Sequence, residues 1–283
     1  MISAGILFAF VTMLTWGIAD VFAKKAIEKT GEMKPLLYGQ VVGTVPIIIY
    51  AAAFLKIPLI SLEIFALGAI SGFLTIAAYL SFYKGMKKGN LAIVNPITGS
   101  YTLITTLLGM IFFQESLKFH HMIAIALVFV GAFLASADLK RIKLKIVPGV
   151  PEAVFAMLGF GVGLFIIKFV SVATGAIISF LLLRIVGLFI LLAYSSLSKI
   201  DIKLPSGSVL GYITLVGILD AIGQLGFNAA ITMEQMSLVA PVIAGFPAVT
   251  VILAILFLKE RPAFSQKIGI VSILAGLVLI SAI

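Results

Sequence analysis

Apolar residues fill this chain in long runs that short polar breaks separate. A bilayer core of about 30 Å is crossed by roughly 20 apolar helical residues, and ten runs of about this length occur. The pattern therefore predicts an all-α polytopic membrane protein without a soluble domain. The predicted spans are residues 3–23, 35–55, 63–83, 91–113, 119–137, 149–169, 176–197, 208–230, 236–258 and 264–282.

The second half of the chain repeats the first. With a shift of 145 residues, Pro96 falls on Pro241 and Glu115 falls on Glu260. We interpret these matched prolines and glutamates as structural: the prolines lie early in a span, and the glutamates anchor its end. The predicted organisation is a first five-helix repeat at 1–137, a basic linker at 138–148 and a second five-helix repeat at 149–283.

Because each repeat has an odd number of spans, the two repeats are expected to lie inverted in the membrane. Lysines are frequent in the breaks at 24–34 and 84–88, whereas the equivalent breaks of the second half hold only Lys168. The bias reverses in the other breaks, which are basic at 199–203 and 259–267. The positive-inside rule then predicts a multi-pass plasma-membrane protein with both termini outside.

Composition agrees with a lipid environment, since 62% of residues are hydrophobic, 11% are charged and the mean hydropathy is +1.25. The chain has no cysteine, and its two histidines are adjacent in a short break, so we expect no metal site or cofactor. The net charge of +9 is attributed to cytoplasmic lysines, and nucleic acid is not an expected partner. We predict no enzyme, because no catalytic motif or phosphate-binding loop occurs.

Several short motifs occur in the same order in both halves. Trp16-Gly17 lies late in the first span, a proline lies early in spans 4 and 9, and FFQE (112–115) and FLKE (257–260) close those spans. In these features the chain resembles the EamA-type transporters of the drug/metabolite transporter (DMT) superfamily. The resemblance covers essentially the whole chain. It implies a ten-helix inverted-repeat carrier that moves small polar metabolites by alternating access. Members of that family are often drawn with both termini inside, and we follow the charges instead.

Polar residues inside the predicted spans are candidate binding groups, because they are costly in a bilayer. Asp220, Gln224 and Asn228 recur every four residues and therefore share one face of span 8. The repeat places Gln224 on Tyr79 and Asn228 on Tyr83 of span 3. Spans 3 and 8 are thus expected to line opposite walls of a central cavity. The alternative is hydrogen bonding between helices.

Three other spans add polar groups to this candidate site. Span 1 carries Trp16 and Asp20 on one face, and span 4 adds Asn95. Arg184 of span 7 is expected either to pair with Asp220 or to bind an anionic substrate. We predict Asp220 as the carboxylate that binds a proton or an amine, with Asp20 as the second choice.

Pro247 has no counterpart in the first half, where Thr102 stands at its position. Since proline removes a backbone donor, we predict an asymmetric kink in span 9 that affects gating.

Together these features predict a secondary active transporter for an amino acid, an amine or a related organic solute. Its other expected partners are membrane lipid and a coupling proton, and it is expected to be a monomer or a homodimer. A flippase for a lipid or a lipid-linked sugar is the alternative.

Overall fold

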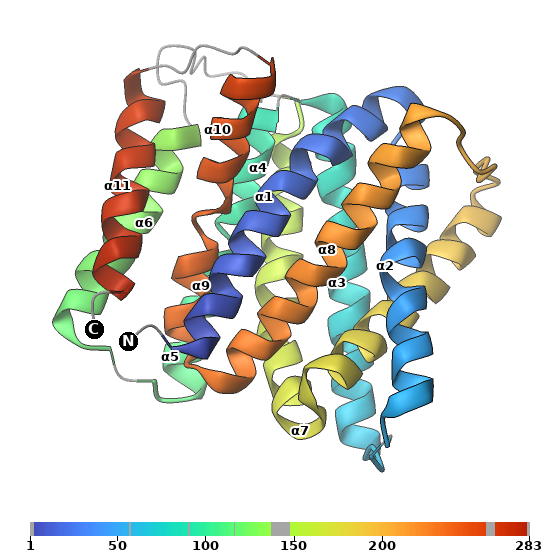
Figure 1. Ribbon diagram of the computed structural model, residues 1–283, viewed down its shortest axis with the longest axis horizontal. Helices are drawn as coiled ribbons and strands as arrows, with labels where there is room; N and C mark the ends of the chain where they lie inside the picture. Colours follow the sequence, from blue (N-terminus) through green and yellow to red (C-terminus); the bar gives the residue numbers. More distant parts are fainter. Residues whose placement is uncertain are drawn as a thin grey trace.

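The computed structural model describes residues 3–56, 58–89, 91–115, 117–136, 148–258 and 264–281, and within these ranges the chain is helical without a strand (Figure 1). The all-α prediction is confirmed. Glu260 and the linker residues 138–147 lie outside the described residues. The helices are α1 (Ala4–Thr30), α2 (Met33–Phe54), α3 (Leu62–Lys88), α4 (Leu91–Gly99), α5 (Tyr101–Phe112), α6 (Phe119–Ser136), α7 (Val150–Leu197), α8 (Ser208–Met233), α9 (Met236–Ile243), α10 (Phe246–Leu258) and α11 (Phe264–Ser281).

Each predicted span coincides with one helix, with two consecutive helices or with one part of α7. Span 4 is divided into α4 and α5, and span 9 is divided into α9 and α10. Spans 6 and 7 form the 48-residue α7, which turns at Gly175. By length and composition, α1, α2, α3, α7 and α8 can each cross a membrane, counting only the described part of the chain. The hydropathy pattern therefore predicted where the chain is helical, but not where those helices break.

The two halves are inverted with respect to each other. In Figure 1 the start of α1 and the end of α11 lie at one edge, which we call the terminal side, and α1 runs away from it. The first part of α7, which is the repeat equivalent of α1, runs back toward the terminal side. The opposite edge is the lysine-rich side, where the breaks carrying Lys29, Lys88 and Lys203 lie.

Glycines bring the helices of the two repeats close together. A Cβ atom on Gly217 of α8 would lie 2.6 Å from the carbonyl oxygen of Gly39 in α2. A Cβ atom on Gly159 of α7 would lie 3.0 Å from the Cβ of Ala78 in α3. Small residues give transmembrane helices this close approach because lipid supplies no hydrophobic force between them. The part of α7 that carries Gly159 is therefore a packing surface against α3.

The breaks in spans 4 and 9 lie at equivalent positions. The first break is at Ser100 and the second is at Ala244 and Gly245, and residue 100 plus 145 is residue 245. The kink predicted at Pro247 is therefore not asymmetric, because span 4 breaks without a proline at that place. Pro247 instead occupies the second position of α10, where proline's missing donor costs little.

The two breaks also touch each other. A Cβ atom on Gly99 would lie 3.0 Å from the ring of Phe246 and 3.2 Å from the ring of Pro247. Spans 4 and 9 thus cross where both are interrupted, near the centre of the molecule. This crossing places Tyr101 and Phe246, which directly follow the two breaks, close to each other.

Candidate functional site

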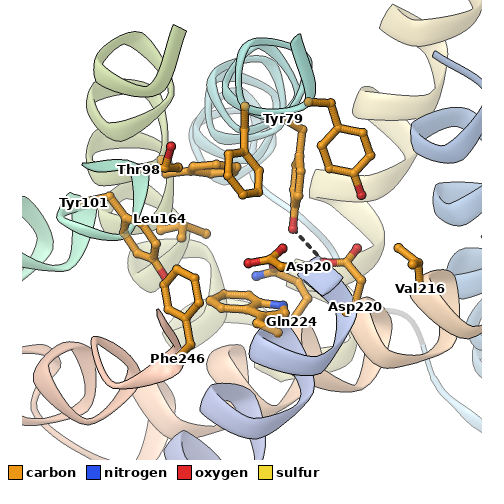
Figure 2. Close-up of a pocket in the computed structure, with 14 residues that line it drawn as sticks. Asp20, Tyr79, Thr98, Tyr101, Leu164, Val216, Asp220, Gln224 and Phe246 are labelled. Atoms are coloured by element: carbon orange, nitrogen blue, oxygen red, sulfur yellow. Dashed lines mark hydrogen bonds between the residues drawn. The ribbon is translucent and has the colours of Figure 1, made fainter. Parts of the chain in front are cut away.

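A cavity lies between the two repeats (Figure 2), and together with the adjoining space open to solvent its empty volume is about 530 Å³. Residues of α1, α3, α4, α5, α7, α8 and α10 contribute to its wall, so both halves of the chain build it. Polar groups at the wall come from Asp20, Thr98, Asp220 and Gln224. The rest of the wall is largely aromatic and consists of Trp16, Tyr79, Phe82, Tyr83, Tyr101, Phe160 and Phe246.

Equivalent residues of the two repeats face one another across this cavity. Tyr101 and Phe246 each follow the break in their span, and their rings stack with centroids 6.5 Å apart. Trp16 and Phe160 are likewise equivalent, at a shift of 144, and both line the wall. The cavity therefore lies on the axis that relates the two repeats. In inverted-repeat carriers this is where the substrate is bound.

The polarity of the wall is less symmetric than its shape. Asp20 faces the cavity from the first repeat, whereas its equivalent, Leu164, is apolar. Tyr79 corresponds to Gln224, and both are at the wall as the repeat predicts. One symmetric cavity thus carries different chemical groups on its two sides, which allows it to hold an asymmetric molecule in one orientation.

Asp220 is engaged with its neighbours. Its Oδ2 lies 2.6 Å from Nη2 of Arg184, and its Oδ1 accepts a hydrogen bond of 2.7 Å from the Tyr79 hydroxyl (Figure 2). Arg184 is buried, with 1% of its side chain exposed, and its guanidinium carbon lies 5.0 Å from the centre of the Phe180 ring. Of the two roles expected for Arg184, the structure shows the pair with Asp220, and Arg184 is not among the residues that line the cavity.

Asp20 has no such partner. Its Oδ2 accepts a hydrogen bond of 2.5 Å from Nδ2 of Asn95, and no described Lys or Arg lies within ion-pair distance of it. Figure 2 shows its carboxyl group at the centre of the cavity. The structure therefore reverses the predicted order of the two carboxylates. Asp20 is the better candidate for a proton or an amine, because Asp220 already has a counter-charge.

The remaining predicted residues lie on the wall or behind it. Tyr83 lines the cavity. Asn95 is buried behind Asp20, and Asn228 is buried one helical turn beyond Gln224. The Asn228 amide contacts the Gln224 side chain at 2.9 Å and Oγ of Ser179 at 3.0 Å. Asn95 and Asn228 therefore orient wall residues in this structure and do not reach the cavity themselves.

Two buried polar atoms at the wall have no hydrogen-bond partner within the described part of the chain. They are Nε1 of Trp16 and the hydroxyl oxygen of Tyr101. Buried polar groups are usually paired. Both of these atoms have almost no accessible surface, and Nε1 of Trp16 packs against Gly223, so a ligand reaches them only when the wall rearranges. Tyr101 and Phe246 are not candidates from sequence, because each is an aromatic residue in an apolar run. The two residues occupy equivalent positions in the repeat, each directly after the break in its span, and this equivalence is the signal that could have identified them.

A narrow crevice, too small to hold a water molecule in this structure, adjoins the cavity. It is lined by Pro35 and Gln40 from the first part of α2, and it shares Tyr79, Tyr83 and Asp220 with the main cavity. The start of α2 lies at the lysine-rich side (Figure 1). The crevice therefore leads from the cavity toward that side, and the hydrogen-bonded side chains of Tyr79 and Asp220 line both.

The sequence and the fold both have known relatives. The model of the EamA-like transporter family matches residues 3–137 and again residues 147–282. An uncharacterised protein of Methanocaldococcus jannaschii is 36% identical over 140 residues, which are 48% of this chain and 95% of that protein. An uncharacterised transporter of Archaeoglobus fulgidus is 25% identical over 218 residues, which are 73% of this chain and 74% of that protein. One crystal structure shares the fold with a TM-score of 0.83 at 14% identity, over 100% of this chain and 99% of that one.

Proposed function

Because the chain belongs to the EamA-like transporter family of the DMT superfamily, we propose that it is a secondary active transporter for a small polar metabolite that works by alternating access. The observation that carries the proposal is Asp20, a carboxyl group with no counter-cation among the described residues, in an aromatic cavity between two inverted repeats. In such carriers the site near the membrane midplane is exposed to each side in turn. A proton bound by Asp20 is the proposed coupling ion.

The wall supports an amine or an amino acid as the substrate. The charge of Asp220 is balanced by Arg184, so Asp20 gives the cavity an uncompensated negative charge when it is ionised. Seven aromatic side chains line the wall, and the face of an aromatic ring attracts organic cations. When the wall rearranges around a substrate, the unpaired Nε1 of Trp16 and hydroxyl of Tyr101 become donors for an acceptor group such as a carboxylate.

Ligand binding in the cavity tests this proposal. We expect an amine or an amino acid from a metabolite panel to raise the melting temperature of the purified protein. A ligand at 100 times its Kd adds about 2.7 kcal/mol to the free energy of unfolding. In Ala19→Phe a large ring fills the cavity beside Asp20, and this ligand shift should disappear.

The matched control is Val11→Phe, which adds the same ring on an exposed, lipid-facing position of the same helix and should keep the ligand shift. Equal shifts in Ala19→Phe and in the wild type would contradict binding in this cavity. Stabilisation by lipids alone would contradict a metabolite carrier and would favour a flippase.

We also propose a plasma-membrane orientation with the termini outside, supported by the lysines that gather at the opposite edge. The chain has no cysteine, so single cysteines can report it directly. A membrane-impermeant thiol reagent should label Lys118→Cys on intact cells, and should label Lys203→Cys only after permeabilisation. The reverse pattern would place the termini in the cytoplasm.

A further inference from the structure

A buried ion pair joins the two repeats at the terminal side. Nζ of Lys168, in the first part of α7, lies 2.6 Å from Oε1 of Glu115, which follows α5. The side chains are only 9% and 6% exposed. Glu115 belongs to the first repeat and Lys168 belongs to the second, so the two repeats cannot separate here while the pair is intact.

The same carboxylate also holds the start of α9. The backbone N–H of Met236 donates to Oε1 of Glu115 at 2.9 Å, and that of Ser237 donates to Oε2 at 2.8 Å. These N–H groups belong to the first turn of the helix and have no partner within it. Span 9 consists of α9 and α10, and α10 begins with Phe246, which lines the cavity. By holding the start of α9, Glu115 therefore connects the terminal side to a span that reaches the cavity.

The charges of this contact are stable in the closed arrangement. Burial alone would raise the pKa of Glu115, but hydrogen bonds from Lys168, Ser237 and Met236 outweigh it and hold the pKa below its ordinary value. Nζ of Lys168 also lies 4.5 Å from the centre of the Phe113 ring, a favourable cation–π distance. Glu115 is therefore ionised at neutral pH, and protein groups supply the hydrogen bonds that water would otherwise give its carboxylate.

The lysine-rich side has no comparable contact among the described residues. Its ion pairs between the repeats, Lys34 with Asp201 and Lys88 with Glu152, each have one largely exposed side chain. Exposed pairs contribute little because water and salt screen them. Lys24, which has the position of Lys168 in the repeat, donates instead to the carbonyl oxygen of Met86 at 2.6 Å, inside its own repeat. The contacts between the two repeats are thus stronger at the terminal side than at the lysine-rich side.

We propose that the contact between Glu115, Lys168 and the start of α9 is the gate of the terminal side, and that it must break for the cavity to open there. This inference rests on alternating access from the proposed function. Breaking the pair removes a buried contact at the terminal side and leaves the lysine-rich side unchanged. The protein should then occupy a terminal-side-open state more often.

Spin labels across the terminal side test the gate. Because the chain has no native cysteine, Lys118→Cys and Gln235→Cys can be labelled in an otherwise unmodified protein. Both positions are exposed, one after α5 and one directly before α9. In proteoliposomes, pulsed EPR should give a single short distance for the labelled wild type. Lys168→Met should raise the population of a longer distance by about tenfold, as expected when one state loses a buried ion pair.

Two further variants separate the gate from a general loss of structure. Lys34→Met breaks a cross-repeat pair on the opposite side and should leave the distance distribution at the terminal side unchanged. Lys168→Arg keeps the charge and should restore the short distance. If Lys168→Met does not yield folded protein, Glu115→Gln, which keeps the shape and an acceptor oxygen, replaces it.

An unchanged distance distribution in a folded Lys168→Met or Glu115→Gln protein would overturn the proposal, as would an equal opening in Lys34→Met. The measurement needs no substrate. If no ligand of the cavity is found, the gate proposal still stands. If the EPR experiment overturns the gate, the assignment of the cavity still stands.

Discussion

Asp20→Asn is expected to reduce gradient-coupled transport in proteoliposomes to the background of protein-free vesicles. Asparagine has nearly the same shape, and its side-chain oxygen can still accept the hydrogen bond from Asn95. It cannot bind and release a proton or balance the charge of an amine. The loss should therefore be functional, with a melting temperature close to that of the wild type. Uptake of an amine or an amino acid driven by a pH gradient is the measurement.

Two controls accompany this prediction. Asp20→Glu keeps the carboxyl group and should retain part of the coupled uptake. Substrate exchange without a gradient should survive in Asp20→Asn if the lost step is proton coupling, and should be lost if Asp20 binds the substrate amine. Full coupled uptake by Asp20→Asn would contradict both roles.

Arg184→Met should destabilise the protein by about 3–5 kcal/mol, because it leaves the Asp220 carboxylate without its cation in a poorly solvated place. Only 13% of the Asp220 side chain is exposed, and Tyr79 alone would then hold the charge. Methionine fills much of the volume of arginine, so the substitution tests the loss of the charge and does not create a large cavity. Thermal or denaturant unfolding of the purified protein in detergent measures the effect.

A double variant shows whether the pair itself is responsible. Arg184→Met combined with Asp220→Asn removes both charges and should recover most of the lost stability, since a buried ion pair often contributes little beyond its neutral replacement. A double variant as unstable as Arg184→Met would mean that Arg184 stabilises the fold mainly through packing, for example on Phe180.

The sequence predicts the spans well because hydropathy measures a property of each segment alone. It does not predict how the spans are interrupted. Pro247 looked like the cause of a kink, yet the equivalent break at Ser100 forms without a proline in that position. The break therefore follows from the crossing of two spans at Gly99 and Phe246, which is a contact between distant parts of the chain.

The site was predictable in its position but not in its pairing. The four-residue period placed Gln224 and Tyr79 correctly at the cavity, because a helix fixes which side chains share a face. It could not show that Asp220 is neutralised by Arg184, 36 residues away, whereas Asp20 is not. The role of a buried charge depends on its partner, and here the partner comes from another helix.

The turns at Gly31 and Gly175 have a mechanical consequence. These glycines are equivalent in the repeat and share one backbone conformation, with φ and ψ of 77° and 176° at Gly31 and of 81° and 168° at Gly175. In practice only glycine adopts this conformation, and each turn joins two spans with almost no intervening chain. Spans 1 and 2, and likewise spans 6 and 7, are therefore each joined through one glycine, and a side chain at either position would strain the turn that sets the direction of the second span.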